Sequence, residues 1–167
     1  MNVMLASGNQ GKLAELQSAL SHLGLALTPQ PKTAEYEVEE TGSTFVENAI
    51  IKARHAAKLS GLPCIADDSG LMVSALNDKP GVRTARFAGD NATSEDNMAL
   101  MLEQLEDKES RAAQFCCVLV FVRHATDPLP VIATATWPGE IAKEKSGADG
   151  FGYDPIFYVP THKKTAA

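Results

Sequence analysis

The start of the chain constrains the fold most, because a short apolar run leads directly into a glycine turn and then a helical pattern. Asn2–Ala6 is predicted to be a strand, and Ser7–Gly11 the turn that ends it. Leucines then recur at intervals of three and four residues from Leu13 to Leu23. The chain therefore begins as strand, turn and helix.

The rest of the chain continues to alternate strands and helices. Thr44, with Glu47 three positions later, predicts a capped helix through about Ser60. Pro63–Ala66 reads as a short buried strand, and Ser94 is predicted to cap another helix. Ala113–Arg123 and Val131–Trp137 are predicted to form a hairpin. We therefore expect an α/β fold, a mixed central sheet flanked by helices.

The totals bound the class of protein. A chain of 167 residues suits a single domain covering 1–167. A net charge of -6 argues against a nucleic-acid polymer as partner, because that mode of binding depends on clustered cations. The sequence lacks the run of roughly 20 apolar residues that a membrane span needs. Three cysteines, two of them adjacent, do not resemble a secreted disulfide framework, so we expect a cytoplasmic protein.

The turn at Ser7–Lys12 is a candidate phosphate-binding loop. Its glycines let backbone amides approach an anion, the following helix adds the positive end of its dipole, and Lys12 adds a full charge. It is not a Walker A loop, because the spacing is short and Leu13 stands where Ser or Thr would contact the metal. An ordinary strand-to-helix turn with a surface lysine is the alternative.

Two adjacent carboxylates, Asp67 and Asp68, follow the short buried strand. Such a pair is costly unless a cation or hydrogen-bond donors offset the charge, and Mg²⁺ is the natural candidate. Because side chains alternate along a strand, we expect only one of the two to face the site. Ser69 and Gly70 are predicted to continue as a turn. The alternative is a helix cap or an Asx turn.

Two further segments have open interpretations. Asn48 and Lys52 lie one turn apart on the predicted helix, after Glu39–Glu40, so a carboxylate, an amide and a cation could share one surface. A solvated helix face is the alternative. Phe151–Pro155 sets two aromatic residues among glycines, where a ring could stack on a purine. The alternative is that Phe151 packs in the core beside a tight turn.

Several segments in chain order closely resemble the Ham1-like inosine triphosphate pyrophosphatase family, and the agreement covers essentially the whole chain. They are Ser7–Asn9 with Lys12, Glu40–Gly42 with Phe45, Glu47–Ala49 and Lys52, Ala66–Leu71, Pro80–Val82 with Ala85 and Arg86, and Gly150–Pro155.

The resemblance implies hydrolysis of ITP, dITP and XTP to the nucleoside monophosphate and pyrophosphate, which removes deaminated purines from the nucleotide pool. It also implies a requirement for Mg²⁺ and assembly as a homodimer. The implied fold is the elongated, two-lobed Ham1/Maf-like fold, with the active site in a cleft between the lobes.

The resemblance also implies the roles of individual residues. Asp68 would be catalytic, as the proton acceptor for water, and would hold the metal together with Glu40. Because a bound metal would lower the pKa of Asp68, we expect it to orient the attacking water rather than act as a strong base. The substrate-binding residues implied are Ser7, Gly8, Asn9, Gln10, Gly11 and Lys12 for the triphosphate, Ser69, and Phe151, Gly152, Tyr153 and Asp154 for the nucleobase pocket.

The sequence departs from the family after Lys164–Ala167, where the family continues with a helix and a base-reading segment. We therefore expect the last helix to be missing, and two alternatives stay open. One is a pyrophosphatase of broader nucleotide preference, and the other is an inactive nucleotide-binding remnant. A phosphatase of the aspartyl-phosphate type is disfavoured, because that chemistry spaces its two aspartates by one residue.

Overall fold

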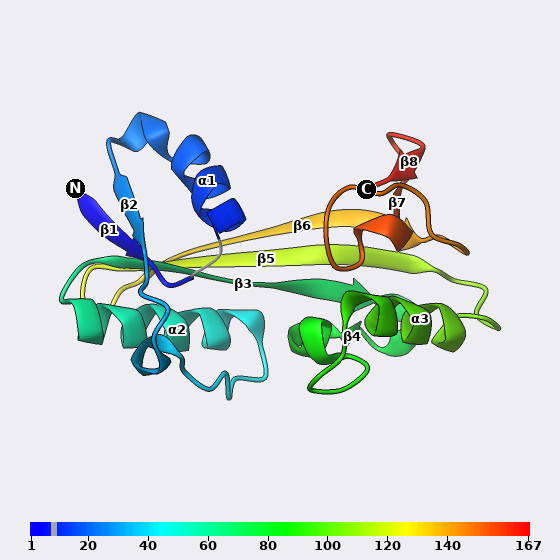
Figure 1. Ribbon diagram of the computed structural model, residues 1–167, viewed down its shortest axis with the longest axis horizontal. Coiled ribbons are helices and arrows are strands. Elements are labelled where there is room, and N and C mark those ends of the chain that lie inside the picture. Colours follow the sequence, from blue (N-terminus) through cyan, green and yellow to red (C-terminus); the bar gives the residue numbers. More distant parts are fainter. Residues whose placement is uncertain (8–9) are drawn as a thin grey trace. The chain divides into compact units, whose positions relative to one another are not determined.

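The computed structural model describes residues 1–7 and 10–167, without the side chain of Gln10 (Figure 1). Its strands form one sheet in the order β2-β1-β3-β5-β6-β7-β8, with β4 beside β3. β1 is parallel to β2 and β3, whereas β3–β4, β6–β7 and β7–β8 are antiparallel. The expected α/β class with a mixed sheet is confirmed.

The chain divides into two compact units, which are described separately. Unit 1 comprises Met1–Asp68 and Val118–Thr134, and unit 2 comprises Ser69–Cys117 and Ala135–Ala167. Strands β3, β5 and β6 contribute residues to both. The single domain over 1–167 stays a prediction, because a division of contacts does not test whether the units fold independently.

Unit 1 opens with the predicted strand, turn and helix. It contains β1 (Asn2–Leu5), α1 (Gln10–Ala19), β2 (Ala26–Pro29) and α2 (Phe45–Ser60), with short 3₁₀ turns η1 (Ser21–Leu23) and η2 (Ala34–Tyr36). In Figure 1, α1 and α2 lie on opposite faces of the strands of this unit. The leucines of α1 pack on Val3, Leu5 and Ile65, as their helical spacing predicted.

Helix α2 begins and ends where the sequence predicted. The Thr44 side chain accepts a hydrogen bond from the Glu47 amide, and the Glu47 carboxylate accepts one from the Thr44 amide, which completes the capping box. Gly61 ends the helix at φ 69°, in the left-handed region. The buried face of α2 consists of alanines and Asn48, and these small side chains let the helix lie close to the sheet.

Strand β3 is longer than predicted and runs from Cys64 to Val73 without a turn. We expected a strand over Pro63–Ala66 with Asp67 and Asp68 at its end, followed by a turn at Ser69 and Gly70. The strand is buried along most of its length and lies between β1 and β5, so pairing within the sheet supplies the backbone partners that a turn would otherwise have to provide. The strand thus carries Asp67 and Asp68 in its interior.

Unit 2 is built on the remaining strands and one helix. These elements are β4 (Lys79–Pro80), α3 (Ser94–Gln104), β5 (Ala112–Val122), β6 (Val131–Ile141), β7 (Phe157–Val159) and β8 (Lys164–Thr165), with 3₁₀ turns at Ser74–Leu76, Gly81–Arg86 and Asp154–Ile156. Its core gathers Met98 and Met101 of α3, and Leu105 just after that helix, against Leu71 and Phe157.

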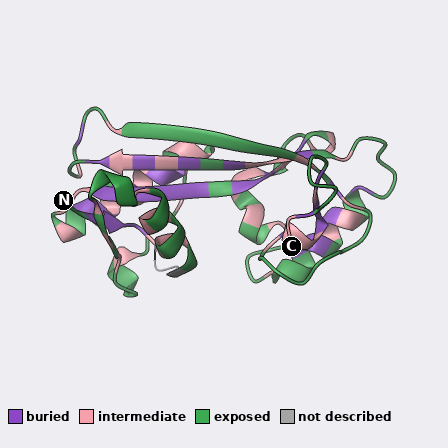
Figure 2. Cartoon of the chain, turned by 90° about the horizontal axis from the view of Figure 1, so that it is seen from above, coloured by how far each residue is buried: buried purple, intermediate pink, exposed green. Residues whose placement is uncertain are grey.

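The cap of α3 differs by one residue from the prediction, whereas the β5–β6 hairpin agrees with it. The cap of α3 is Thr93, whose side chain accepts from the Asp96 amide, and not Ser94. β5 and β6 are consecutive strands and neighbours in the sheet, which confirms the hairpin. Figure 2 contrasts the buried β3 with the exposed length of β6.

Within residues 1–7 and 10–167, no helix has the length and apolarity to cross a membrane.

Candidate active site

The adjacent carboxylates of β3 each pair with a lysine from a different helix. Lys12 Nζ, in the first turn of α1, lies 2.5 Å from Asp67 Oδ2. Lys52 Nζ, in the middle of α2, lies 2.9 Å from Asp68 Oδ1. Neighbouring side chains on a strand point to opposite faces, and α1 and α2 cover those two faces. Each carboxylate thus meets a lysine from a different helix, and the expectation that only one of the two faces the site stays a prediction.

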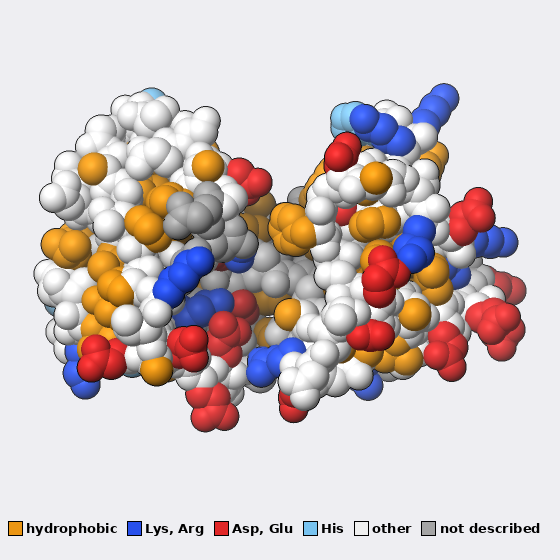
Figure 3. All heavy atoms as spheres, in the orientation of Figure 1, with side chains coloured by type: hydrophobic (Ala, Val, Ile, Leu, Met, Phe, Trp, Pro, Cys, Tyr) orange, Lys and Arg blue, Asp and Glu red, His pale blue; other side chains and the backbone are white. Residues whose placement is uncertain are grey.

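Lys52 also joins the two residues implied as metal ligands. Its Nζ lies 3.0 Å from Glu40 Oε1 as well as 2.9 Å from Asp68 Oδ1. One ammonium group therefore holds both carboxylates, although 28 positions separate them in the sequence. Figure 3 shows basic and acidic side chains side by side on this face of unit 1. The structure thus brings Glu40 and Asp68 together around one cation.

Burial and neighbouring charges shift the protonation of this group. Burial is the main cause that raises the pKa of Asp68, the nearby Glu40 carboxylate adds to the rise, and Lys52 opposes it. Burial alone would lower the pKa of Lys52, but Asp68 and Glu40 together outweigh burial and raise it. Lys52 therefore stays charged, while Asp68 holds a proton more readily than an ordinary aspartate.

One oxygen of Asp68 lacks a well-aligned donor within the described part of the chain. Asp68 Oδ2 is buried, and none of residues 1–7 and 10–167 donates a hydrogen bond to it with good geometry. The nearby Asn48 accepts from the Gly42 amide through Oδ1 at 2.8 Å, and its side chain also opposes the rise in the pKa of Asp68. A buried carboxylate oxygen without a partner is costly unless a ligand or cation satisfies it.

The carboxylates of Glu40 and Asp68 could hold a metal ion that takes few protein ligands. The part of the chain that the structure describes holds no group of three or more His, Cys, Asp or Glu side chains arranged around a metal. Mg²⁺ commonly takes only one or two carboxylates and completes its shell with phosphate oxygens and water. The carboxylates of Glu40 and Asp68 fit that donor set, and Asp68 Oδ2 is the oxygen that lacks a donor among the described residues.

A cleft of about 340 Å³ opens beside these carboxylates, within unit 1. The sequence pointed to Glu40 and Lys52 but not to the other residues of this wall, most of which lie on a loop that gives no periodic signal. The lining residues are Ala6, Gln30, Tyr36, Glu37, Val38, Glu40 and Lys52. The pairing of Asn48 and Lys52 on one face of α2 was the signal that did point to this site.

The predicted phosphate loop is only partly described. Ser7 follows β1, and its amide donates to Leu5 O at 2.8 Å. Gly8 and Asn9 lie outside the described residues, and Gln10 and Gly11 open α1. Lys12 contacts the acidic pair through Asp67, the chain neighbour of Asp68. The contacts of Ser7–Lys12 with a triphosphate stay a prediction.

The aromatic loop belongs to unit 2, and its two rings behave differently. Phe151 is 76% exposed, whereas Tyr153 is buried in the core and its Oη donates to Thr84 O at 2.9 Å. Asp154 Oδ2 accepts from the Phe151 amide at 2.9 Å and fixes the turn between them. Phe151 therefore offers a ring to a ligand, while Tyr153 and Asp154 hold the loop. Ser69 is exposed on β3, and its substrate contact stays a prediction.

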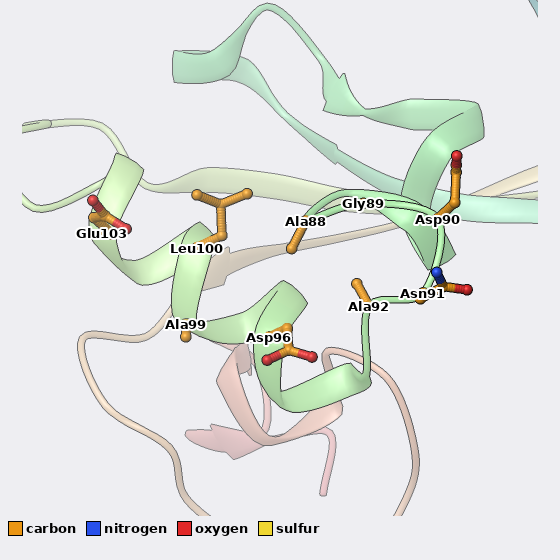
Figure 4. Close-up of a pocket in the computed structure, with 9 residues that line it drawn as sticks. All are labelled: Ala88, Gly89, Asp90, Asn91, Ala92, Asp96, Ala99, Leu100 and Glu103. Carbon is orange, nitrogen blue, oxygen red and sulfur yellow. The ribbon is translucent and has the colours of Figure 1, made fainter.

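A larger depression of about 640 Å³ lies in unit 2 (Figure 4). Its charged lining residues are all acidic, so it repels a polyphosphate. The Asp96 carboxylate is also engaged by Thr93, and Asp90 pairs with Arg83. We assign no chemistry to this depression. Its lining residues are Ala88, Gly89, Asp90, Asn91, Ala92, Asp96, Ala99, Leu100 and Glu103.

Comparison with known proteins supports the resemblance seen in the sequence. The profile of the Ham1 family matches residues 3–167. The dITP/XTP pyrophosphatase of Shigella flexneri is 54% identical over 167 residues, which are 99% of this chain and 85% of that protein. The dITP/XTP pyrophosphatase of Coxiella burnetii is 53% identical and is covered to 84% of its length.

Solved structures of Ham1 proteins are also similar to this chain. A HAM1 protein from Coxiella burnetii superposes with a TM-score of 0.95 at 53% identity, covering 100% of this chain and 86% of that one. The Ham1 protein of Staphylococcus aureus gives 0.90 at 43% identity, covering 100% and 85%.

Proposed function

Because this chain belongs to the Ham1 family, we propose that it is a hydrolase that cleaves ITP, dITP and XTP to the nucleoside monophosphate and pyrophosphate. Relatives that share more than half of its residues are named for activity on dITP and XTP. The observation that carries the proposal is that Lys52 joins the carboxylates of Glu40 and Asp68, while Lys12 pairs with Asp67, the chain neighbour of Asp68.

Lys12 and Lys52 can bind the triphosphate and offset its negative charge. Attack of water on a phosphorus needs in-line placement and neutralisation of negative charge, and it needs no covalent nucleophile. Lys12 and Lys52 each hold an ammonium group against a carboxylate, and phosphate oxygens can take the place of that carboxylate as partners. We place the triphosphate along Ser7–Lys12 for this reason, since the start of α1 adds amide donors.

Asp68 is the residue we assign to the attacking water. Burial raises its pKa, so its carboxylate accepts a proton more readily than an exposed aspartate does. Lys52 fixes one of its oxygens at 2.9 Å, which orients the group. With a metal bound, the same carboxylate would orient the water more than deprotonate it.

We propose Mg²⁺ as the cofactor, held by Glu40 and Asp68. The support is that both carboxylates already meet at one cationic group, and that Asp68 Oδ2 is buried without a donor among the described residues. A divalent ion there would neutralise charge on the phosphate oxygens and polarise the reacting group. The lysines would then be free to contact phosphate.

The remaining family properties complete the proposal. The base would stack on the exposed Phe151, with Gly152, Tyr153 and Asp154 shaping that pocket. The protein would act as a homodimer on the cytoplasmic nucleotide pool, with no nucleic-acid polymer or membrane as partner.

Pyrophosphate release from ITP, XTP, ATP and GTP, with and without Mg²⁺, tests the function. We expect Mg²⁺-dependent release from ITP and XTP, and a loss of about 10²-fold or more for Asp68→Asn. Asp90→Asn, which removes an exposed carboxylate of unit 2, is the matched control and should retain activity. Equal turnover of ATP and ITP would reveal broad specificity, and no release from any of the four would refute the proposal.

A further inference from the structure

A single exposed segment forms most of the wall of the cleft. Residues 30–42, called the strap below, connect β2 to the cap of α2 and include only one short turn, η2 (Ala34–Tyr36). The strap contributes Gln30, Tyr36, Glu37, Val38 and Glu40 to the cleft. Its position therefore sets the shape of the cleft and the placement of Glu40.

The two ends of the strap are held by backbone amides. The Gln30 amide donates to Leu5 O at 2.9 Å, at the end of β1. The Gly42 amide donates to Asn48 Oδ1 at 2.8 Å, at the start of α2, and Glu40 pairs with Lys52 nearby. These contacts fix residue 30 and residues 40–42.

The middle of the strap is held by a histidine of α2. His55 Nε2 lies 2.6 Å from Glu35 O, in η2. The carbonyls of Thr33 and Ala34 already accept from Tyr36 and Glu37 within the turn. Among the described residues, His55 makes the one hydrogen bond that joins residues 31–39 to the rest of unit 1.

We infer that His55 is a positioning residue for the substrate cleft, which acts by tethering η2 and with it Tyr36 and Glu37. His55 stands three residues after Lys52 on α2, so one helix carries both the ammonium group at the carboxylates and the tether of the strap. Without the tether, residues 31–39 would keep the packing of the half-buried Tyr36 and Val38 but lose the hydrogen bond at their middle, and substrate binding would have to order them more.

The expected change in KM is the change that the loss of one hydrogen bond to a backbone carbonyl would cause. Such a bond contributes enough to change a binding equilibrium about three- to tenfold. The loss falls on KM, because the lysines and Asp68 are held by contacts that do not involve the strap between residues 31 and 39. The kcat is expected to stay within about twofold of wild type, as when ground state and transition state lose equally.

The experiment compares three variants, and it depends on the proposed function for its kinetic part only. His55→Leu removes the donor, and His55→Gln restores an N–H at a similar reach. His22→Leu, on the exposed turn η1, is the matched control. KM and kcat for ITP are measured at saturating Mg²⁺, and hydrogen exchange is measured at the amides of Tyr36 and Glu37, which are bonded within η2.

We expect His55→Leu to raise KM and to accelerate exchange at Tyr36 and Glu37, His55→Gln to restore both, and His22→Leu to change neither. Unchanged exchange in His55→Leu, or a fall in kcat at constant KM, overturns the inference. If His55→Leu does not fold, His55→Asn, which keeps polarity but not reach, takes its place. If wild type hydrolyses no nucleotide, the proposed function fails, and the exchange data alone decide the role of His55.

Discussion

Replacing Lys52 with Met tests the centre of the site, because the change removes the cation that Glu40 and Asp68 share. The side chains of Lys52, Glu40 and Asp68 are 18%, 29% and 11% exposed, so both ion pairs are partly buried. Breaking a fully buried pair costs about 3–5 kcal/mol and an exposed pair about 0–1 kcal/mol. We therefore expect Lys52→Met to lower stability by about 2 kcal/mol.

Thermal unfolding at neutral pH measures this change. For a chain of 167 residues, about 2 kcal/mol corresponds to a fall in Tm of about 4–8 °C. Mg²⁺ should raise the Tm of Lys52→Met by more than it raises the Tm of wild type, because the ion then meets two carboxylates with no competing ammonium group. Lys58→Met, which removes an exposed lysine of the same helix, is the control and should lose at most about 1 kcal/mol.

Two results would refute this reasoning. A Tm for Lys52→Met equal to that of Lys58→Met would mean that the ion pairs contribute no stability. A fall in Tm that Mg²⁺ does not reverse would mean that Glu40 and Asp68 do not hold the ion.

Three further predictions concern other parts of the chain. Gly42→Ala should lower stability by about 1–3 kcal/mol in urea unfolding, since a Cβ there would lie 2.6 Å from Asn48 Oδ1. Asp127→Asn should lower Tm at pH 7, because Arg123 holds the pKa of Asp127 well below its usual range. This stabilisation is complete above the ordinary aspartate pKa of about 4 and is lost progressively as the pH falls from there toward the lowered pKa, so the difference in Tm should shrink below a pH of about 4. Phe151→Ala should leave Tm unchanged and raise KM for ITP, and an unchanged KM would exclude stacking on the base.

Local chemistry made parts of the fold predictable. The capping box of Thr44 and Glu47, and the stop at Gly61, depend on neighbours in the sequence, so both ends of α2 could be located. The leucines of α1 and the β5–β6 hairpin follow from periodicity and turn residues in the same way.

Features that depend on distant contacts could not be located. β3 continues through Asp67–Gly70 because it lies inside the sheet, although its composition is typical of a turn. The partnership of Lys12 with Asp67 joins residues 55 positions apart, and no local pattern specifies it. The resemblance to a family named Asp68 and Glu40, but the structure was needed to show that Lys52 joins them.

The opposed pointing of Asp67 and Asp68 makes β3 sensitive to length rather than to composition. Apolar exchanges within Cys64–Ala66 leave both carboxylates facing their lysines. Deleting or inserting a single residue there would turn each side chain to the other face of the sheet, so that both ammonium partners would be lost at once. Any working variant of the chain therefore has to keep the number of residues between the start of this strand and its acidic pair, or change it by an even number.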